Sequence, residues 1–339
     1  MLLRLLAMAT RTLAVLVAVF GFNAAWAPAA LAWNESGHRI IGAAAAEHMA
    51  PELKATIAAA LRAHPRYTKD LERYRPRNLG GLTEFEWLLG QAAQWPDRIR
   101  RFNNEPFYRR KGLVEKYHRG RWHYINLPLY LRDADAVLNI ADPTLVIDSD
   151  NPDNALAALA FIRTQLLDPA VSLTDKGLWI SWALHLIADV HQPLHTTAIF
   201  ERSRWPRGDR GGNEVKIKGS GKDGRLDSLH YYWDSAISNV RKSRDIKRLV
   251  GVLNKQQVSE QLSAVVDPVV WIREGNDTAR KVVYGPLLDQ LRDSSVVAIS
   301  NEYTRQAHSV ALAKGALAAR RTALWLQEGL VEALQDNSN

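Results

Sequence analysis

Two stretches of the sequence place a histidine and an aspartate at a spacing that suits metal binding. His185 and Asp189 are four residues apart, and the same spacing separates His230 from Asp234. On a helix, residues four apart project from one face about one turn from each other, so an imidazole and a carboxylate could hold one ion between them. A lone pair of this kind is more often an ion pair on a helix surface, but two such pairs favour metal binding.

A further histidine follows the first pair in a segment that cannot stay helical. Pro193 cannot continue a helix, so we expect the chain to break near Gln192 and to present His195 from the turn. With this histidine, the two pairs supply five nitrogen and oxygen ligands, which is more than one catalytic metal ion needs. The spacing therefore predicts a cluster of metal ions. His191 lies between these ligands, and we expect it to be structural.

Three more candidate ligands lie upstream, and each has a simpler alternative. His38 falls in the first turn of an expected helix, where it is available for binding. Asp97 stands beside arginines, where it could equally cap a helix or pair with Arg100. His123 lies in an aromatic, extended segment, where a lone histidine is usually a buried core residue. Taken alone, none of these three residues indicates a metal site. Together with the two downstream pairs they become candidate ligands.

The first 32 residues have the features of a signal peptide. Two arginines precede an apolar run over residues 13–20, and Ala30–Ala32 supplies the small side chains that signal peptidase needs. Cleavage there would leave Trp33 as the first residue, although Ala25–Ala27 is a competing site. The apolar run is too short for a membrane span of about 20 residues. We therefore expect a secreted or periplasmic protein without stable membrane association.

The chain after this leader is basic and lacks cysteine. Of the 44 lysines and arginines two lie in the leader, which leaves 42 against 36 aspartates and glutamates and a formal charge of +6. The lack of cysteine excludes disulfides, thiolate metal sites and thiol catalysis. We find no internal repeat and no linker, so residues 33–339 are predicted to form one domain.

Apolar periodicity predicts a mainly helical fold. Residues 214–219 alternate polar and apolar side chains and a glycine-rich turn follows, so we expect a short β-hairpin near residues 214–228. Most of the remaining chain has the spacing of helices with one buried face, so the predicted fold class is all-α. The principal expected helices span residues 39–49, 85–100, 154–167, 176–190, 230–237 and 302–334.

Basic and aromatic residues cluster beside the candidate ligands. Such loops would raise the local concentration of a polyanion near a metal site. Their rings could stack on unpaired bases, which is how single-stranded nucleic acid is held without sequence preference. An ordinary solvated basic surface is the alternative. The residues are Arg101, Phe102, Phe107, Tyr108, Arg109, Arg110, Lys111, Tyr117, Arg119 and Arg121 in one stretch, and Arg202, Arg204, Trp205, Arg207 and Arg210 in another.

The ordered set of motifs resembles the S1/P1 nuclease family. It comprises a tryptophan directly after the leader, a histidine five residues later, W-x-D-x-I-R, W-H-Y-I-N, H-x-x-x-D-x-x-x-x-x-H, Gly-Gly-Asn and H-x-x-x-D. Any one motif would be weak, but together they match the family's ligand positions in order. The resemblance runs from Trp33 to about Ile237, and the helical remainder is compatible with it.

The resemblance implies a mainly helical catalytic domain over residues 33–339 that binds three zinc ions. Trp33 would contribute its α-amino nitrogen and carbonyl oxygen. Ligand type alone would also accept manganese or cobalt, so zinc itself comes from the resemblance. The implied ligands are Asp97, His123 and His185 for the first ion, Trp33 and His38 for the second, Asp189 as a bridge between these two, and His195, His230 and Asp234 for the third.

The resemblance also implies the reaction. A water held between two zinc ions would lose its proton near neutral pH and act as the nucleophile, so no serine or cysteine is needed. The third ion would stabilise charge on the leaving 3′-oxygen, which gives 5′-phosphate products. The expected activities are hydrolysis of single-stranded DNA or RNA and removal of 3′-phosphate from nucleotides.

Several positions are implied to contact substrate. Asn213, in the Gly-Gly-Asn turn, matches the family's base-recognising asparagine, and Gly212, Tyr124 and Arg210 are the other candidates for substrate binding. Asn126 stands where several members have an aspartate close to the attacking water, so it is a candidate for orienting that water. The chain also departs from fungal and plant members by lacking disulfides and by its longer, arginine-rich loop before the Gly-Gly-Asn turn.

Two other functions stay open at this point. Zinc-dependent phospholipase C is a related trinuclear phosphodiesterase of similar fold with an N-terminal tryptophan ligand, but the arginines and the Gly-Gly-Asn turn favour nucleic acid over a zwitterionic lipid. A secreted helical binding protein without catalysis would bind no metal. We expect a monomer that acts on single-stranded nucleic acid and nucleotides.

Overall fold

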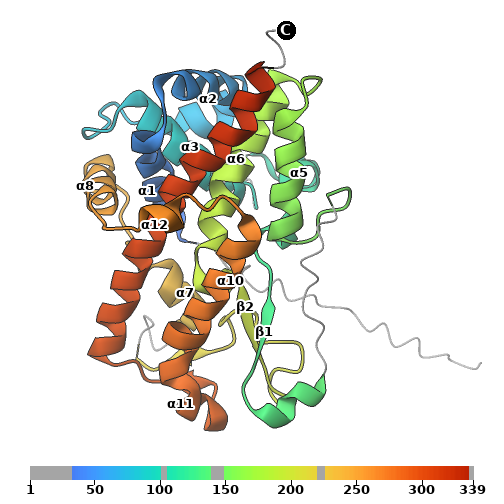
Figure 1. Ribbon diagram of the computed structural model, residues 1–339, viewed down its shortest axis with the longest axis vertical. Helices are drawn as coiled ribbons and strands as arrows, with labels where there is room; N and C mark the ends of the chain where they lie inside the picture. Colours follow the sequence, from blue (N-terminus) through green and yellow to red (C-terminus); the bar gives the residue numbers. More distant parts are fainter. Residues whose placement is uncertain (1–32, 101–104, 139–148, 220–225, 336–339) are drawn as a thin grey trace, which may run out of the picture.

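The computed structural model describes residues 33–100, 105–138, 149–219 and 226–335. The predicted signal peptide therefore lies outside the described residues, as do Arg101 and Phe102. The described chain is built mainly of helices, with two short two-stranded sheets (Figure 1). The expected mainly helical fold is confirmed.

Four short strands are interspersed among the α-helices along the described chain. The α-helices are α1 (Glu35–Ala45), α2 (Pro51–Ala63), α3 (Glu84–Arg98), α4 (Phe107–Tyr117), α5 (Ala155–Leu167), α6 (Leu173–Val190), α7 (Leu229–Asp234), α8 (Ser243–Asn254), α9 (Glu260–Ser263), α10 (Pro268–Thr278), α11 (Leu288–Asp293) and α12 (Asn301–Gln335). The strands are β1 (Leu127–Tyr130), β2 (Thr197–Phe200), β3 (Lys216–Ile217) and β4 (Val296–Val297).

Two helices begin earlier than apolar periodicity predicts, because capping side chains define their first residues. α1 begins earlier than expected because the Asn34 side chain accepts a hydrogen bond from the Gly37 N–H. α6 likewise begins three residues early, because Ser172 accepts from the Asp175 N–H. α6 ends at Val190, where the following proline was expected to stop it.

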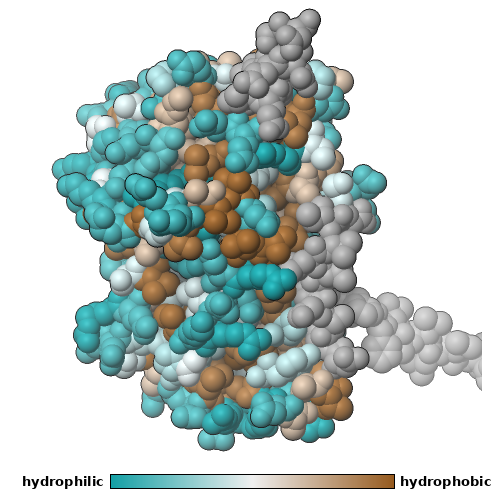
Figure 2. Space-filling view, in the orientation of Figure 1, coloured by the Kyte–Doolittle hydropathy of each residue, from teal (hydrophilic) through white to brown (hydrophobic). Residues whose placement is uncertain are grey.

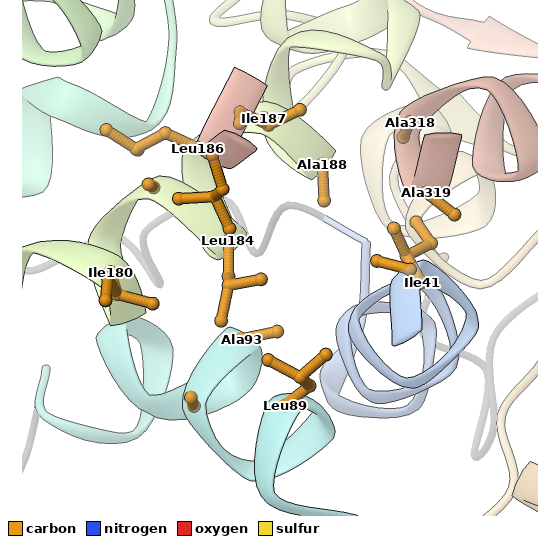
Figure 3. Packing of buried hydrophobic residues seen from close by; sticks show 14 of the residues in the cluster. Ile41, Leu89, Ala93, Ile180, Leu184, Leu186, Ile187, Ala188, Ala318 and Ala319 are labelled. Carbon is orange, nitrogen blue, oxygen red and sulfur yellow. The ribbon is translucent and has the colours of Figure 1, made fainter. Parts of the chain in front are cut away.

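α6 lies at the centre of the helical body and packs against α2, α3, α5 and α12 (Figure 1). Every residue from Ile180 to Val190 is buried, so this segment is a core helix that has no solvent-facing side. In Figure 3, Leu184 of α6 lies near Leu89 of α3, while Ile41 of α1 lies toward Ala319 of α12. Any polar side chain on α6 in this segment must therefore be satisfied inside the protein.

α1 and α3 approach each other closely because glycine faces the contact. A Cβ at Gly42 would lie 2.7 Å from the Ala93 Cβ and 2.9 Å from the Leu89 carbonyl oxygen. A Cβ at Gly90, on the other helix, would lie 2.9 Å from the Arg39 carbonyl oxygen. This packing brings the first turn of α1 next to the end of α3.

A parallel strand pair joins two segments that carry candidate ligands. β1 pairs with β2 from Leu127 opposite Thr197 to Tyr130 opposite Phe200. β1 follows His123 and β2 follows His195 in the sequence. The pairing therefore holds the two histidine-bearing turns side by side.

The β-hairpin predicted near residues 214–228 is only partly formed. Lys216 and Ser228 make one isolated antiparallel bridge, and the turn at residues 220–225 lies outside the described residues. The main partner of β3 is instead β4, which runs parallel to it with Lys216 opposite Val296. β4 lies about 80 residues after β3, so the local sequence pattern that predicted the hairpin could not reveal this pairing.

Figure 2 shows one face of the molecule, where hydrophilic side chains surround a central apolar strip. A cavity of about 230 Å³ between α5, α10 and α12 is lined mainly by apolar residues, which include Leu159, Val266 and Trp325. Among the described helices, none combines the length and the apolar character that crossing a bilayer requires.

Candidate metal centre and its pocket

α6 presents His185 and Asp189 from one face, and both side chains are fully buried. His185 Nδ1 donates a hydrogen bond of 2.7 Å to the carbonyl oxygen of Ala93 in α3. Because a carbonyl can only accept, the proton is fixed on Nδ1, and Nε2 of the neutral imidazole carries a lone pair. Nε2 lies 3.2 Å from Asp189 Oδ2. Burial alone would lower the pKa of His185, but Asp189 and Asp97 raise it, so this position favours a positive charge, either a proton or a metal cation.

Asp97 and His123 join His185 in the first group of potential ligands. Asp97 lies near the end of α3 and His123 ends the 3₁₀ turn Gly120–His123. The three ligand atoms lie within 4.8 Å of one another. His123 Nδ1 is 2.9 Å from His185 Nε2 and 3.1 Å from Asp189 Oδ2. The residues predicted for the first ion thus come together, while their coordination of metal stays a prediction.

His38 joins His185 and Asp189 in the second group. Its Nε2 lies 3.2 Å from Asp189 Oδ1 and 4.0 Å from Asp97 Oδ2. The His38 ring stacks on the His185 ring, with centroids 3.9 Å apart. The two oxygens of Asp189 therefore face different groups, which is the geometry expected of the predicted bridge.

The start of the described chain is held beside these groups. The Trp33 side chain is fully buried, and its Nε1 donates a hydrogen bond of 2.9 Å to the Ala188 carbonyl oxygen of α6. The next N–H, that of Asn34, donates 2.9 Å to the carbonyl oxygen of Asp234. Trp33 is thus placed between the ends of α6 and α7, and coordination through its amino nitrogen stays a prediction.

His195, His230 and Asp234 form the third group, again within 4.8 Å of one another. His195 ends the 3₁₀ turn Pro193–His195, whereas His230 and Asp234 are one turn apart on α7. His230 Nε2 lies 3.5 Å from Asp234 Oδ2. The Gln192 amide donates a hydrogen bond of 2.7 Å to Asp234 Oδ1, which orients that carboxyl group.

Backbone carbonyls fix the orientation of the third group's imidazoles. His195 Nδ1 donates 2.5 Å to the carbonyl oxygen of His123, and His230 Nδ1 donates 2.6 Å to that of Gly211. Metal-binding histidines commonly donate their second ring nitrogen in this way, because the bond fixes both tautomer and ring orientation. The remaining Nε2 atoms are therefore available as ligands.

Several buried polar atoms of this centre have no hydrogen-bond partner among the described residues. They are both ring nitrogens of His38, Nε2 of His123 and of His195, and Oδ1 of Asp189. An unsatisfied buried polar group costs about 1–3 kcal/mol, and native proteins contain few of them. Metal ions would satisfy these lone pairs, and the nitrogen and oxygen donor set suits zinc. The residues therefore fit a multinuclear metal site.

Burial controls the ionisation of the centre. Burial, reinforced by neighbouring positive charges, lowers the pKa of His38, His123 and His195 well below the usual range, so these imidazoles stay neutral and can bind metal. Burial also raises the pKa of Asp189 to about 7 and that of Asp234 well above its usual range. A further positive charge close by would therefore favour the charged form of both carboxyl groups at neutral pH.

A cavity of about 320 Å³ opens beside the third group, and His195 and His230 form part of its wall. Arg100 also lines it, and because its Nε lies 3.2 Å from Asp97 Oδ1, this arginine connects the cavity with the first group. The cavity can thus hold a phosphate next to the metal ligands. Its other polar lining residues are Tyr124, Asn126, Arg207, Arg210 and Asn213.

The structure places most of the predicted substrate residues in this wall. Tyr124, Asn126, Arg210 and Asn213 all line the cavity. Gly212 is not among the lining residues; its carbonyl oxygen accepts a hydrogen bond of 3.2 Å from the N–H of His230, so it supports a ligand instead. Direct substrate contact by Gly212 is therefore not what the geometry favours.

The simpler alternatives raised for single residues are partly correct. Asp97 pairs with Arg100 and also lies in one of the potential ligand groups, so the ion pair is confirmed and its coordination of metal stays a prediction. His191 lies outside the three groups: its Nδ1 donates 2.7 Å to the Ile187 carbonyl oxygen, and its Nε2 accepts 3.0 Å from Arg321. His191 is structural, as expected.

One buried carboxyl group holds the turn that precedes Asn213. Asp209 accepts hydrogen bonds from the N–H groups of Ile199, at 3.0 Å, and Gly212, at 2.9 Å, and from the Tyr284 hydroxyl, at 2.7 Å. Burial raises the pKa of Asp209 to about 6 even though these hydrogen bonds act against the rise. The turn is therefore fixed from inside the protein.

The same turn contains a backbone conformation that restricts its sequence. Arg210 has a φ of 58°, which is uncommon for a residue with a side chain, and Gly211 follows with a φ of 61°. A Cβ on Gly211 would collide with the carbonyl oxygen of Leu194. Glycine is thus required where the turn packs against the third group.

Sequence reasoning missed several residues of the site. Arg100 was considered only as a partner of Asp97, and Arg207 only as part of a basic stretch, although its place in an arginine-rich loop was a usable signal. Gln192 and Asp209 support the site, but no motif marks either one, since their roles depend on tertiary contacts.

Comparison with known proteins agrees with this geometry. The sequence profile of the S1/P1 Nuclease family matches residues 33–330. Endonuclease 4 of Arabidopsis thaliana is 24% identical over 222 residues, which cover 61% of this chain. The match spans 56% of the length of that plant protein.

Proposed function

The chain belongs to the S1/P1 nuclease family, and from this premise we propose that it is an exported, zinc-dependent nuclease. It would hydrolyse single-stranded DNA and RNA to 5′-phosphate products and remove 3′-phosphate from nucleotides. The observation that carries the proposal is the convergence of three buried groups of histidine and aspartate beside one basic cavity. Neither a binding protein nor an ordinary core needs such a set of unsatisfied imidazoles.

The proposed metal ligands are the three groups together with the Trp33 backbone. Zinc would supply a Lewis acid that lowers the pKa of water and neutralises charge on phosphoryl oxygens. Asp189 would bridge the first two ions, because its two oxygens face different groups. The proposed ligands are Trp33 and, from the three groups, His38, Asp97, His123, His185, Asp189, His195, His230 and Asp234.

The cavity wall supplies the remaining functions. Water would add to phosphorus while the bond to the 3′-oxygen breaks, and a proton from the water would pass to the leaving oxygen. Asn126 lines the cavity and would orient this water through its amide. Arg100 would bind a nonbridging phosphoryl oxygen, because it lines the cavity next to the first group. Tyr124 and Asn213 would stack on and hydrogen-bond a base.

The basic helix α4 lies in the sequence between two residues that line the cavity. Its neighbours in sequence, Arg100 and Gly120, both line the cavity, while Phe107 and Tyr108 at its start are 85% and 77% exposed. Exposed rings next to arginines suit stacking with unpaired bases and contact with phosphates. This surface supports a long single strand as substrate.

Substrate assays test the proposal. The purified, processed chain should contain about three zinc ions and should hydrolyse single-stranded DNA, RNA and 3′-nucleotides. Preferential hydrolysis of phosphatidylcholine would identify a phospholipase instead, although the arginine-lined cavity argues against a zwitterionic head group. A preparation that binds no metal would support the non-catalytic alternative and overturn the proposal.

The role of the Trp33 amine links export to activity. An amine can coordinate metal only when it is free, so cleavage between Ala32 and Trp33 would complete the site. A chain that keeps one extra residue before Trp33 should lose metal and activity. Full zinc content and full activity in that chain would refute the role of the amine.

A further inference from the structure

The arginine-rich loop before Gly211 contains four arginines that fall into two classes. The first two are neutralised by acids. Arg202 Nε lies 3.7 Å from Asp135 Oδ1, and Arg204 Nε lies 3.3 Å from Glu201 Oε2. Neither of these arginines lines the cavity beside the third group. Their charges therefore serve the packing of the loop.

The other two arginines, Arg207 and Arg210, are different. Both line the cavity, and neither side chain has an ion pair or hydrogen bond with another described residue. No aspartate or glutamate is among the described residues that form this wall. Two uncompensated guanidinium groups therefore face the same space as the ligands His195 and His230.

The protein holds Arg210 in place at the expense of local backbone strain. Its positive φ persists because Asp209 is buried on one side and the two following glycines pack on Leu194 and His230 on the other. These contacts hold the Arg210 backbone at the wall of the cavity, which its side chain lines. A guanidinium group is planar and can donate two parallel hydrogen bonds to phosphate oxygens.

We propose that Arg207 and Arg210 form a second phosphate subsite, which binds the phosphate next to the one that is hydrolysed. The inference rests on the proposed nuclease function. A nucleoside within a strand carries phosphate on both its 3′- and its 5′-oxygen. With the 3′-phosphate at the metal ligands, the 5′-phosphate would bind the two arginines. The favoured substrates are therefore internal strand units and nucleoside 3′,5′-bisphosphates, and nucleoside 3′-monophosphates are poorer substrates.

Matched small substrates test this subsite. The kcat/KM for release of 3′-phosphate is compared for a nucleoside 3′,5′-bisphosphate and the 3′-monophosphate of the same base. The wild-type protein should favour the bisphosphate by roughly 10-fold or more, as expected for hydrogen bonds between charged groups. Arg207→Ala and Arg210→Gly should each reduce this ratio, and the double variant should bring it close to one. Glycine is chosen at Arg210 because it tolerates the positive φ.

Arg202→Ala is the matched control, since it removes the same charge from the same loop outside the cavity. It should leave the ratio unchanged. A second readout uses the salt dependence of binding to a single-stranded oligonucleotide. Its logarithmic slope should fall by about 0.7 for each cavity arginine removed and by less for Arg202→Ala.

The outcomes separate this subsite from the proposed function. If the wild-type protein hydrolyses both substrates equally well, or if the double variant keeps the wild-type ratio, the subsite is refuted and the nuclease function stands. If neither substrate is hydrolysed, the nuclease function fails. Calorimetric titration with the bisphosphate then decides the subsite alone: tighter binding by the wild-type protein than by the double variant supports it, and equal binding overturns it.

Discussion

Asp189 is the side chain on which the first two ligand groups depend. Its Oδ1 lies 3.2 Å from His38 Nε2 and its Oδ2 lies 3.2 Å from His185 Nε2. Asp189→Asn keeps the volume but removes the charge that two neighbouring ions need. We expect the variant to retain about one of three zinc ions and to lose activity by more than about 100-fold, since even supporting residues of metal sites contribute 10- to 100-fold.

Elemental analysis of the purified variant checks this prediction. Asp175→Asn is the control, because it makes the same chemical change in the exposed first turn of the same helix. It should keep the full zinc content. An Asp189→Asn protein that still holds three ions would show that this carboxylate is not a bridge.

Glu201 gives a pH prediction that is independent of metal. Burial alone would raise its pKa, but hydrogen bonds from Ser203 and Arg204 outweigh burial and lower the pKa of Glu201 to about 2. A lowered folded-state pKa contributes stability that is present above the unfolded pKa, near 4.5, and is lost as the pH falls toward 2. Glu201→Gln should therefore lower the unfolding midpoint at pH 7 and have progressively less effect below pH 4.5. Urea unfolding at several pH values measures this, and a pH-independent difference would contradict it.

At the scale of elements, local signals predicted the helices that carry the ligands. The end of α6 could be predicted because Pro193 stops any helix, but its start could not, because the first turn contains polar residues and is defined by the Ser172 cap. The pairing of β3 with β4 could not be predicted either, since the two strands are far apart in sequence. Positions of ligands along their helices were thus accessible, whereas strand partners were not.

The contact between α1 and α3 gives the prediction at this scale. Gly42→Ala would place a methyl group 2.7 Å from the Ala93 Cβ and 2.9 Å from a backbone oxygen of α3, so the helices must separate. Overpacking of this kind costs about 1–3 kcal/mol. Because His38 lies on α1 and Asp97 on α3, the separation should also weaken zinc binding.

Denaturant unfolding and zinc titration measure the two effects. Gly251→Ala is the matched control, because a Cβ at this position in α8 meets no atom within 4 Å. It should leave zinc affinity unchanged and should stabilise the helix slightly. If Gly42→Ala leaves both the free energy of unfolding and the zinc affinity unchanged or raised, as expected for the control, close packing of α1 on α3 is not required at this position.

At the scale of the whole molecule, the ligands come from five separate segments that only the tertiary fold brings together. Each ligand carried its own local motif, so the set could be predicted in order along the chain. The cavity wall is less well marked: Asn213 belongs to the Gly-Gly-Asn motif, but Arg207 belongs to no motif, and only the fold brings it beside Arg100 and Asn213. The candidate metal ligands were therefore easier to predict than the residues that line the cavity.

The metal-free centre should destabilise the whole molecule. Several of its buried imidazole and carboxylate atoms lack hydrogen-bond partners among the described residues, so zinc that binds only the folded state should add stability, about 4 kcal/mol at a free concentration 1,000 times Kd. Chelation should therefore lower the Tm by several degrees, and added zinc should restore it. Calorimetry of native, chelated and reloaded protein checks this, and an unchanged Tm would argue that the ligand groups bind no metal.

The central claim is that one buried centre binds three metal ions. Anomalous diffraction at the zinc absorption edge, from crystals of the processed chain, tests it most directly. We predict three peaks: one at Asp97, His123 and His185, one at His38 beside the Trp33 amine, and one at His195, His230 and Asp234, with Asp189 between the first two. Peaks located elsewhere, or no peak within the centre of zinc-saturated crystals, would contradict the account.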